Sequence, residues 1–136
     1  MLLVELKDLV KSYGSVQALN GLNLKIPKGS LFGLLGPNGS GKTTTLRILC
    51  TLISPDSGHV KIGEINALTN SREARAKLGY VAQEVSLDKI LTGRELLQFQ
   101  GDIYHLPTKS RNLRIDELIA RLEMNDWIDR RCGSYS

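Results

Sequence analysis

The sequence has no long apolar run, few aromatic residues and only two cysteines. No apolar segment approaches the ~20 residues that a membrane-spanning helix needs, and charge appears at Glu5, too early for a signal peptide. Neither Cys50 nor Cys132 has a Cys or His neighbour at metal-ligand spacing. These absences favour a reduced, cytosolic protein, and any membrane role is expected to come through a partner.

The sequence also has no block of residues that carry charge of one sign. The 18 Lys and Arg residues are interspersed with 14 Asp and Glu residues, for a net charge of +4. Nucleic-acid-binding surfaces usually carry a basic stripe, often with aromatic residues between the charges. Because aromatic residues make up only 5% of the 136 residues, the composition gives nucleic-acid binding little support. The length fits about one domain.

A glycine-rich stretch at residues 36–44 fits the Walker A pattern G-x-x-x-x-G-K-[ST]. Glycines let consecutive backbone N–H groups turn inward around a polyphosphate. Lys42 is placed to reach β- and γ-phosphate oxygens, and the Thr43 hydroxyl suits Mg²⁺. The alternative is an ordinary glycine-rich turn with a surface lysine. The stretch consists of Gly36, Pro37, Asn38, Gly39, Ser40, Gly41, Lys42, Thr43 and Thr44.

The segments on either side of this loop have their own patterns. Residues 31–35 form a short apolar run, which predicts a buried parallel strand. Residues 44–52 lack glycine and proline and have Leu46, Leu49 and Cys50 at helical spacing. The sequence therefore predicts a strand, a glycine loop and a helix in succession.

Further strands and helices are predicted from periodicity and end signals. Alternating residues at 3–8, 22–26 and 60–62 predict strands, and another is predicted at 79–83, giving a mixed sheet. Asn70 with Glu73 predicts the start of a short helix to Leu78, and Thr92 with Glu95 predicts a capping box. A third helix is predicted at 111–124, with one apolar face. That face contains Ile115, Leu118, Ile119 and Leu122.

Tyr13 is an aromatic residue in a predicted turn region, Lys11-Ser12-Tyr13-Gly14. Its ring can stack on a base or can simply cover the end of a strand. The local pattern alone favours the second interpretation.

These motifs, in this order, resemble those of the ATP-binding subunit of ABC transporters. Tyr13 stands about where that family places an adenine-stacking aromatic residue, and the resemblance favours stacking over packing. Gln83 follows a predicted strand, as the Q-loop glutamine does. Residues 91–97 look like the helical subdomain of bacterial drug and polysaccharide exporters, whose membrane subunits are separate chains. Residues 133–136 look like the approach to the signature motif, with Tyr135 and Ser136 in its first two positions.

The resemblance implies an α/β fold, a P-loop NTPase of the ABC type. Residues 1–85 would be an incomplete nucleotide-binding core, and residues 86–136 the start of the helical subdomain. ATP and Mg²⁺ are the implied cofactors, with Lys42 and Gln83 in catalytic roles and Thr43 and Gln83 at the metal. Tyr13, the loop and Ser136 would contact nucleotide.

The implied partners are a transmembrane permease subunit and a second nucleotide-binding subunit, with no nucleic acid. The protein is then expected in the cytoplasm, held on the inner face of the membrane through its partner. Two alternatives are a nucleotide-binding fragment without turnover and a soluble ABC-type ATPase outside transport. The sequence contains no counterpart of the signature glycines, the acidic strand or the switch histidine. We therefore expect this stretch to bind nucleotide without turnover, and the complete protein to hydrolyse it.

Overall fold

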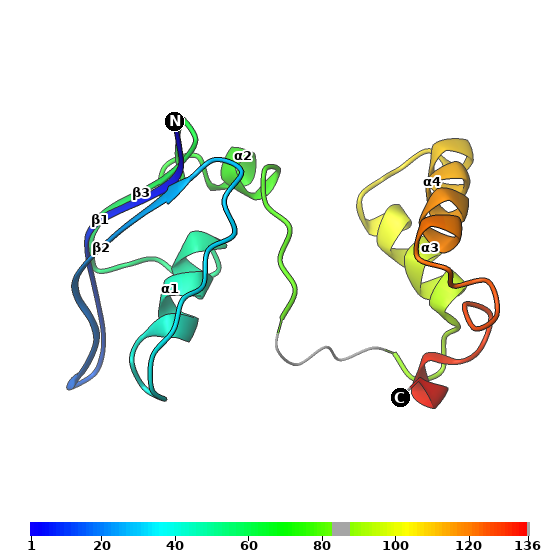
Figure 1. Ribbon diagram of the computed structural model, residues 1–136, viewed down its shortest axis with the longest axis horizontal. Helices are drawn as coiled ribbons and strands as arrows, with labels where there is room; N and C mark the ends of the chain where they lie inside the picture. Colours follow the sequence, from blue (N-terminus) through cyan, green and yellow to red (C-terminus); the bar gives the residue numbers. More distant parts are fainter. Residues whose placement is uncertain (83–87, 136) are drawn as a thin grey trace. The chain divides into compact units, whose positions relative to one another are not determined.

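The computed structural model describes residues 1–82 and 88–135. The chain forms two compact units, Met1–Val81 and Ala82–Ser136 (Figure 1). The predictions for Gln83 and Ser136 fall outside the described residues.

The first unit is built on a four-stranded sheet in the order β2-β1-β3-β4. The strands are β1 (Leu2–Tyr13), β2 (Val16–Pro27), β3 (Ser57–Ile62) and β4 (Ile65–Asn66). The predicted alternation is confirmed, because Val4 and Leu6 of β1 and Val60 and Ile62 of β3 are buried. The three strand pairings of the described residues are all antiparallel.

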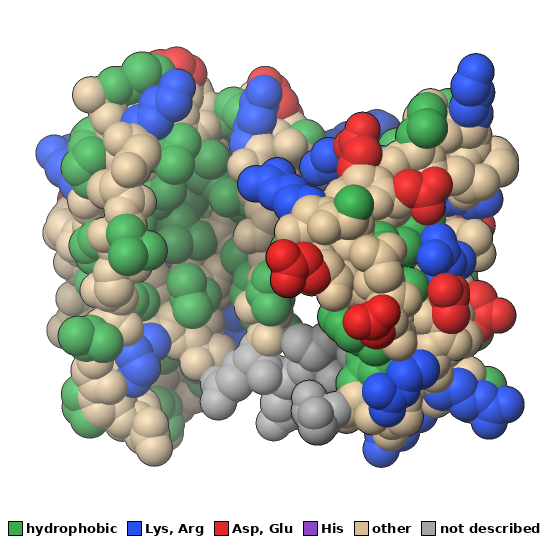
Figure 2. Space-filling model, turned by 45° about the vertical axis from the view of Figure 1, so that its right-hand side comes forward, with side chains coloured by type: hydrophobic (Ala, Val, Ile, Leu, Met, Phe, Trp, Pro, Cys, Tyr) green, Lys and Arg blue, Asp and Glu red, His purple; other side chains and the backbone are tan. Residues whose placement is uncertain are grey.

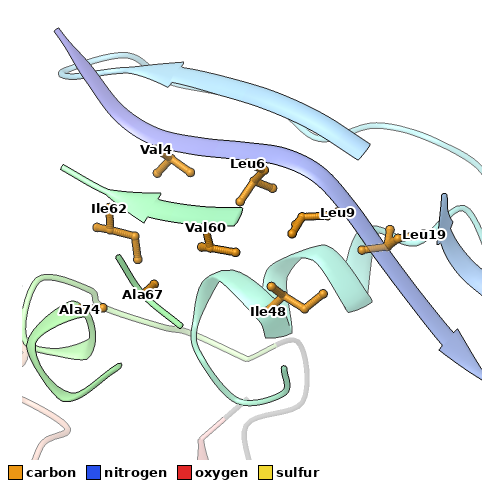
Figure 3. Close-up of a cluster of buried hydrophobic side chains, with 9 residues drawn as sticks. All are labelled: Val4, Leu6, Leu9, Leu19, Ile48, Val60, Ile62, Ala67 and Ala74. Atoms are coloured by element: carbon orange, nitrogen blue, oxygen red, sulfur yellow. The ribbon is translucent and has the colours of Figure 1, made fainter. Parts of the chain in front are cut away.

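Helix α1 (Lys42–Leu49) covers one face of this sheet. Figure 3 shows Ile48 of α1 in the same buried cluster as side chains of β1 and β3, and its exposed fraction is 0%. Burying such a side chain contributes about 1.5–3 kcal/mol to folding. The helix was predicted, and Leu49 of its predicted apolar face packs against the core. The prediction for Leu46 was wrong, because Thr45 and Ile48 are the buried residues and Leu46 is 46% exposed.

The strand predicted at residues 31–35 is not present in this structure. Residues 31–37 carry no regular secondary structure, and the side chains of Leu31 and Leu35 are open to solvent. Figure 2 shows hydrophobic side chains on the surface of this unit. A strand needs a neighbouring strand for its hydrogen bonds, and none of the strands in the described residues pairs with residues 31–35. The strand predicted at 79–83 is likewise wrong for residues 79–82, where Val81 is exposed.

Helix α2 (Ser71–Arg75) completes the first unit. Asn70 occupies the N-cap position as predicted, but its side chain makes no capping hydrogen bond, and the helix ends at Arg75 rather than near Leu78. The first N–H groups of a helix have no partner within the helix, so a missing cap leaves them without a side-chain acceptor at the N-cap. The short length of α2 is consistent with this weak start.

The second unit packs two helices, α3 (Gly93–Ile103) and α4 (Thr108–Arg121). The predicted capping box is confirmed: the Glu95 backbone N–H donates to Thr92 Oγ1 at 3.2 Å, and the Thr92 N–H donates to Glu95 Oε2 at 2.8 Å. Helix α4 begins at Thr108, before the predicted Arg111, because Pro107 at the N-cap (φ −57°) suits a helix start. On the surface that Figure 2 displays, acidic and basic side chains of this unit are interspersed.

A small apolar core joins the helices of this unit. Two residues of the predicted apolar face of α4, Ile115 and Ile119, are buried, whereas Leu122 is 59% exposed. The buried residues are Ile115, Ile119, Met124 and Ile128, with Leu97 packed against them.

Two segments of the second unit, residues 89–92 and 131–133, pair with each other. Thr92 and Arg131 form an antiparallel bridge, and the short 3₁₀ helix η1 (Cys132–Ser134) follows it. The Cys132 N–H donates to the Leu91 carbonyl at 2.8 Å, and the Gly133 N–H donates to the Lys89 carbonyl at 3.2 Å. Among the residues that the structure describes, no helix has the length and apolar character to cross a membrane.

Candidate functional site

The glycine loop ends where α1 begins, and Gly41 fixes that junction. Gly41 has φ +86°, a left-handed conformation that side chains rarely adopt. A Cβ at this position would lie 2.6 Å from the Ala18 carbonyl oxygen and 2.7 Å from Leu19 Cδ2. Only glycine therefore lets the loop pass so close to β2.

Lys42 folds back into the loop. Its Nζ donates to the Gly36 carbonyl at 2.7 Å and to the Pro37 carbonyl at 2.6 Å, and lies 3.4 Å from Ser40 Oγ. All three partners are neutral oxygens. In the part of the chain that the structure describes, the Lys42 ammonium forms no ion pair. The loop thus holds a positive charge without a counter-charge.

The first turn of α1 adds donors to this positive region. Its N-cap is Gly41, which offers no side-chain cap, and the first turn has no acidic residue. The unpaired N–H groups and the helix dipole together favour an anion at such an end. Thr45 Oγ1 donates to the Gly41 carbonyl at 2.8 Å, whereas the Thr43 side chain is exposed and makes no hydrogen bond within the described residues. The arrangement is therefore able to bind a polyphosphate.

Tyr13 lies at the end of β1, where β2 begins. It pairs with Val16 across the antiparallel ladder, and its exposed fraction is 48%. Gly41 packs on Ala18 and Leu19 of the same strand, two and three residues beyond Val16. Because a strand rises about 3.3 Å per residue, the first residues of β2 bring Tyr13 and the glycine loop to the same end of the sheet.

Two residues beside Tyr13 were not predicted as part of a site. Lys11 Nζ lies 5.7 Å from the Tyr13 ring centroid, and Asp56 Oδ1 accepts a hydrogen bond from the same Nζ at 2.8 Å. In the sequence, Asp56 stands in Pro55-Asp56-Ser57-Gly58, a run of residue types that is typical of a turn. Lys11 is two residues from Tyr13 in the sequence, and this closeness was the available signal, although the β1–β2 register shifts between Lys11 and Ser12. The contact with Asp56 spans 45 positions and has no local signal.

Two predicted site residues, Gln83 and Ser136, lie outside the described residues. Their neighbour Tyr135 is described. Its hydroxyl lies 3.1 Å from the Trp127 carbonyl oxygen, and the two rings meet edge to face with centroids 5.0 Å apart. Within the described residues, no three His, Cys, Asp or Glu side chains are grouped to hold a metal. Any metal at this site would therefore depend on other ligands.

A family model and individual relatives among known proteins match this chain. A family model described as ABC transporter matches residues 19–136. The daunorubicin resistance ATP-binding protein DrrA2 of Streptomyces coeruleorubidus is 39% identical over 133 residues, which cover 98% of this chain and 41% of that protein. The probable multidrug ABC transporter ATP-binding protein YbhF of Escherichia coli (strain K12) is 37% identical over 115 residues, 85% of this chain and 20% of that protein.

A solved structure shares the fold. It is the dimeric, post-hydrolysis state of the ATP-binding cassette MJ0796 bound to ADP and Pi, with a TM-score of 0.80 and 29% identity. The likeness covers 98% of this chain and 63% of that one. This confirms the predicted α/β fold of the P-loop type. The chain spans less than half the length of these two curated relatives.

Proposed function

The chain belongs to the ABC transporter family, and from that premise we propose that it is part of an ATP-binding subunit that powers export through a separate membrane subunit. ATP would bind at residues 36–44, with its base on Tyr13, and the complete protein would hydrolyse it. The names of DrrA2 and YbhF, an ATP-binding drug-resistance protein and a probable multidrug transporter component, support this class of function.

The observation that best supports ATP binding is the set of hydrogen-bond partners of the Lys42 ammonium. Its ammonium is held by neutral loop oxygens at 2.6 and 2.7 Å and forms no ion pair among the described residues. An ammonium is attracted more strongly to an anionic phosphate oxygen than to a neutral carbonyl oxygen, because the phosphate adds the attraction between two opposite charges. Phosphate oxygens would therefore compete well for this lysine, and the uncapped start of α1 adds favourable N–H donors.

The residues present also fit Mg²⁺ that arrives with the nucleotide. Mg²⁺ is usually held by one or two protein oxygens together with phosphates and waters, so a site with few carboxylates suits it. The exposed Thr43 hydroxyl is one such oxygen. When bound, the ion would neutralise charge on the β- and γ-phosphate oxygens. The contribution of Gln83 to the metal and to catalysis stays a prediction from the sequence.

The proposed partners are a transmembrane permease and a second nucleotide-binding subunit, on the cytoplasmic face of the membrane. The dimeric state of the MJ0796 cassette supports the second of these partners. Contacts of Tyr135 and Ser136 with nucleotide of the second subunit stay predictions. The interspersed charges argue against a nucleic-acid partner.

Two measurements test this function. Calorimetric titration of the purified protein with Mg-ATP should show saturable binding, and its absence would reject the nucleotide site. Affinity purification of the full-length protein from its own cells should recover a membrane subunit. Recovery of RNA or ribosomes in its place would favour a soluble ATPase outside transport.

A further inference from the structure

A cation stands beside the aromatic ring proposed to stack on the base. Lys11 and Tyr13 are two residues apart in β1, and the pairing of β1 with β2 shifts register between Lys11 and Ser12. Lys11 Nζ is 5.7 Å from the centroid of the Tyr13 ring, within the ~6 Å over which a cation is attracted to an aromatic face. Because the Tyr13 residue is 48% exposed, part of its surface stays open to a ligand.

Asp56 fixes this lysine. Its Oδ1 accepts from Lys11 Nζ at 2.8 Å, and its Oδ2 accepts from the Ser12 backbone N–H at 2.7 Å. The Asp56 N–H also donates to the Val10 carbonyl at 2.9 Å. The hydrogen bond from Lys11 holds the pKa of the Asp56 carboxyl below its ordinary value, so the carboxylate is ionised at neutral pH. Three bonds therefore tie Asp56 to the last residues of β1, and both carboxylate oxygens are used.

From this geometry we propose that Lys11 and Asp56 are positioning residues for the nucleotide base. Asp56 holds the ammonium, and the ammonium holds Tyr13 so that its open face meets the base. A ring that is held before the ligand arrives loses less conformational freedom on binding. The inference rests on the proposed function, because it takes Tyr13 as the stacking residue.

Two substitutions separate this role from a structural one. Asp56→Asn keeps an oxygen for the Ser12 N–H but removes the negative charge that holds Lys11. Lys11→Met keeps the alkyl chain and removes the ammonium. In the full-length protein with Mg²⁺, each should weaken ATP binding about twofold to fivefold, the size of an exposed cation–π contact. Inorganic tripolyphosphate, which has no base, should bind equally to wild type and variants, and Lys11→Arg should retain ATP affinity.

A double-mutant cycle provides the sharper readout. In a Tyr13→Ala background, Asp56→Asn should cause no further loss of ATP affinity, because the ring on which it acts is gone. The matched control is Glu5→Gln, which removes the Lys25 to Glu5 ion pair of 3.5 Å in the same sheet. This control should change neither ATP nor tripolyphosphate binding.

The outcomes are distinct. Unchanged ATP affinity in Asp56→Asn and Lys11→Met, with Lys42→Ala weakened, would overturn the inference and leave the proposed function standing. An equal loss of ATP and tripolyphosphate affinity would show that the pair only maintains the fold, and would overturn it too. If Asp56→Asn fails to fold, the comparison of Lys11→Met with Lys11→Arg decides the matter. Absence of ATP binding in wild type would remove the proposed function and this inference with it.

Discussion

The Nζ atom of Lys42 lies 2.6 Å from the carbonyl oxygen of Pro37, so the last part of the glycine loop is bonded to its first part. A second bond, to the Gly36 carbonyl at 2.7 Å, reinforces the closure. The lysine thus shapes the loop, and its charge already lies inside the site where phosphate would bind.

Replacing Lys42 should remove most of the affinity for Mg-ATP. Lys42→Ala deletes a charge-assisted contact to phosphate, worth about 1.5–3 kcal/mol or about tenfold to hundredfold in affinity. Calorimetric titration measures the change. Lys28→Ala is the matched control, because Lys28 is an exposed lysine outside the loop, and it should leave affinity unchanged. Equal affinity of wild type and Lys42→Ala would refute the assignment.

Tyr13 should be replaceable only by another aromatic residue. Tyr13→Ala should lose about 1–3 kcal/mol of ATP affinity, whereas Tyr13→Phe and Tyr13→Trp should retain it, because stacking uses the ring face. Discrimination between ATP and GTP should be weak. Tyr104→Ala, at an exposed tyrosine of the second unit, serves as the control. A strong base preference that survives Tyr13→Ala would place base recognition elsewhere.

Gly41 should not tolerate a side chain. Gly41→Ala would place a Cβ 2.6 Å from the Ala18 carbonyl oxygen at φ +86°, and the left-handed conformation alone costs about 1–2 kcal/mol. The variant should unfold at lower urea concentration and bind Mg-ATP more weakly. Gly33→Ala is the control, because a Cβ there meets nothing within 4 Å. Similar behaviour of the two variants would contradict the packing of the loop on β2.

The capping box should stabilise the second unit measurably. Thr92→Ala removes the side-chain acceptor for the Glu95 N–H and should cost about 0.5–2 kcal/mol. Fluorescence of Trp127, the single tryptophan, reports unfolding of this unit in urea. Thr108→Ala is the matched control, because Thr108 begins α4 but caps nothing. We expect the control to stay within about 0.5 kcal/mol of wild type.

Stability of the second unit should fall in acid. Arg94 Nε donates to Asp129 Oδ1 at 2.7 Å, and this bond lowers the pKa of Asp129 from its ordinary value of 3.8. A carboxyl with a lowered pKa in the folded state stabilises above its unfolded pKa, and this stability is lost as pH falls through the folded value. The urea midpoint followed by Trp127 fluorescence should therefore drop below about pH 4. Asp129→Asn should reduce this dependence, whereas Asp126→Asn should leave it unchanged.

Features encoded by neighbouring residues were predictable from the sequence. The alternation in β1 and β3 marked their buried faces, and the Thr92 to Glu95 spacing gave a capping box that the structure confirms. The order of glycine loop and helix was also right. In each case the signal and the structure depend on residues a few positions apart, where steric and hydrogen-bonding rules act directly.

Features that depend on distant partners were not predictable. The apolar run at residues 31–35 indicates that burial of this segment would be favourable. A strand forms only when another strand pairs with it. The choice of Ile48 over Leu46 as the buried residue of α1 depends on where the sheet lies. Asp56 joins Lys11 across 45 positions, and no single sequence indicates such a pairing.

The pairing of two segments of the second unit has a consequence for protein engineering. Residues 89–92 and 131–133 run side by side through the Thr92 to Arg131 bridge and two backbone hydrogen bonds. A segment whose entry and exit are adjacent is a natural insertion, since its removal or exchange leaves a gap that a short turn spans. We therefore expect the intervening helices α3 and α4 to tolerate exchange for the corresponding helices of a relative, because the replacement has to match only these two paired segments.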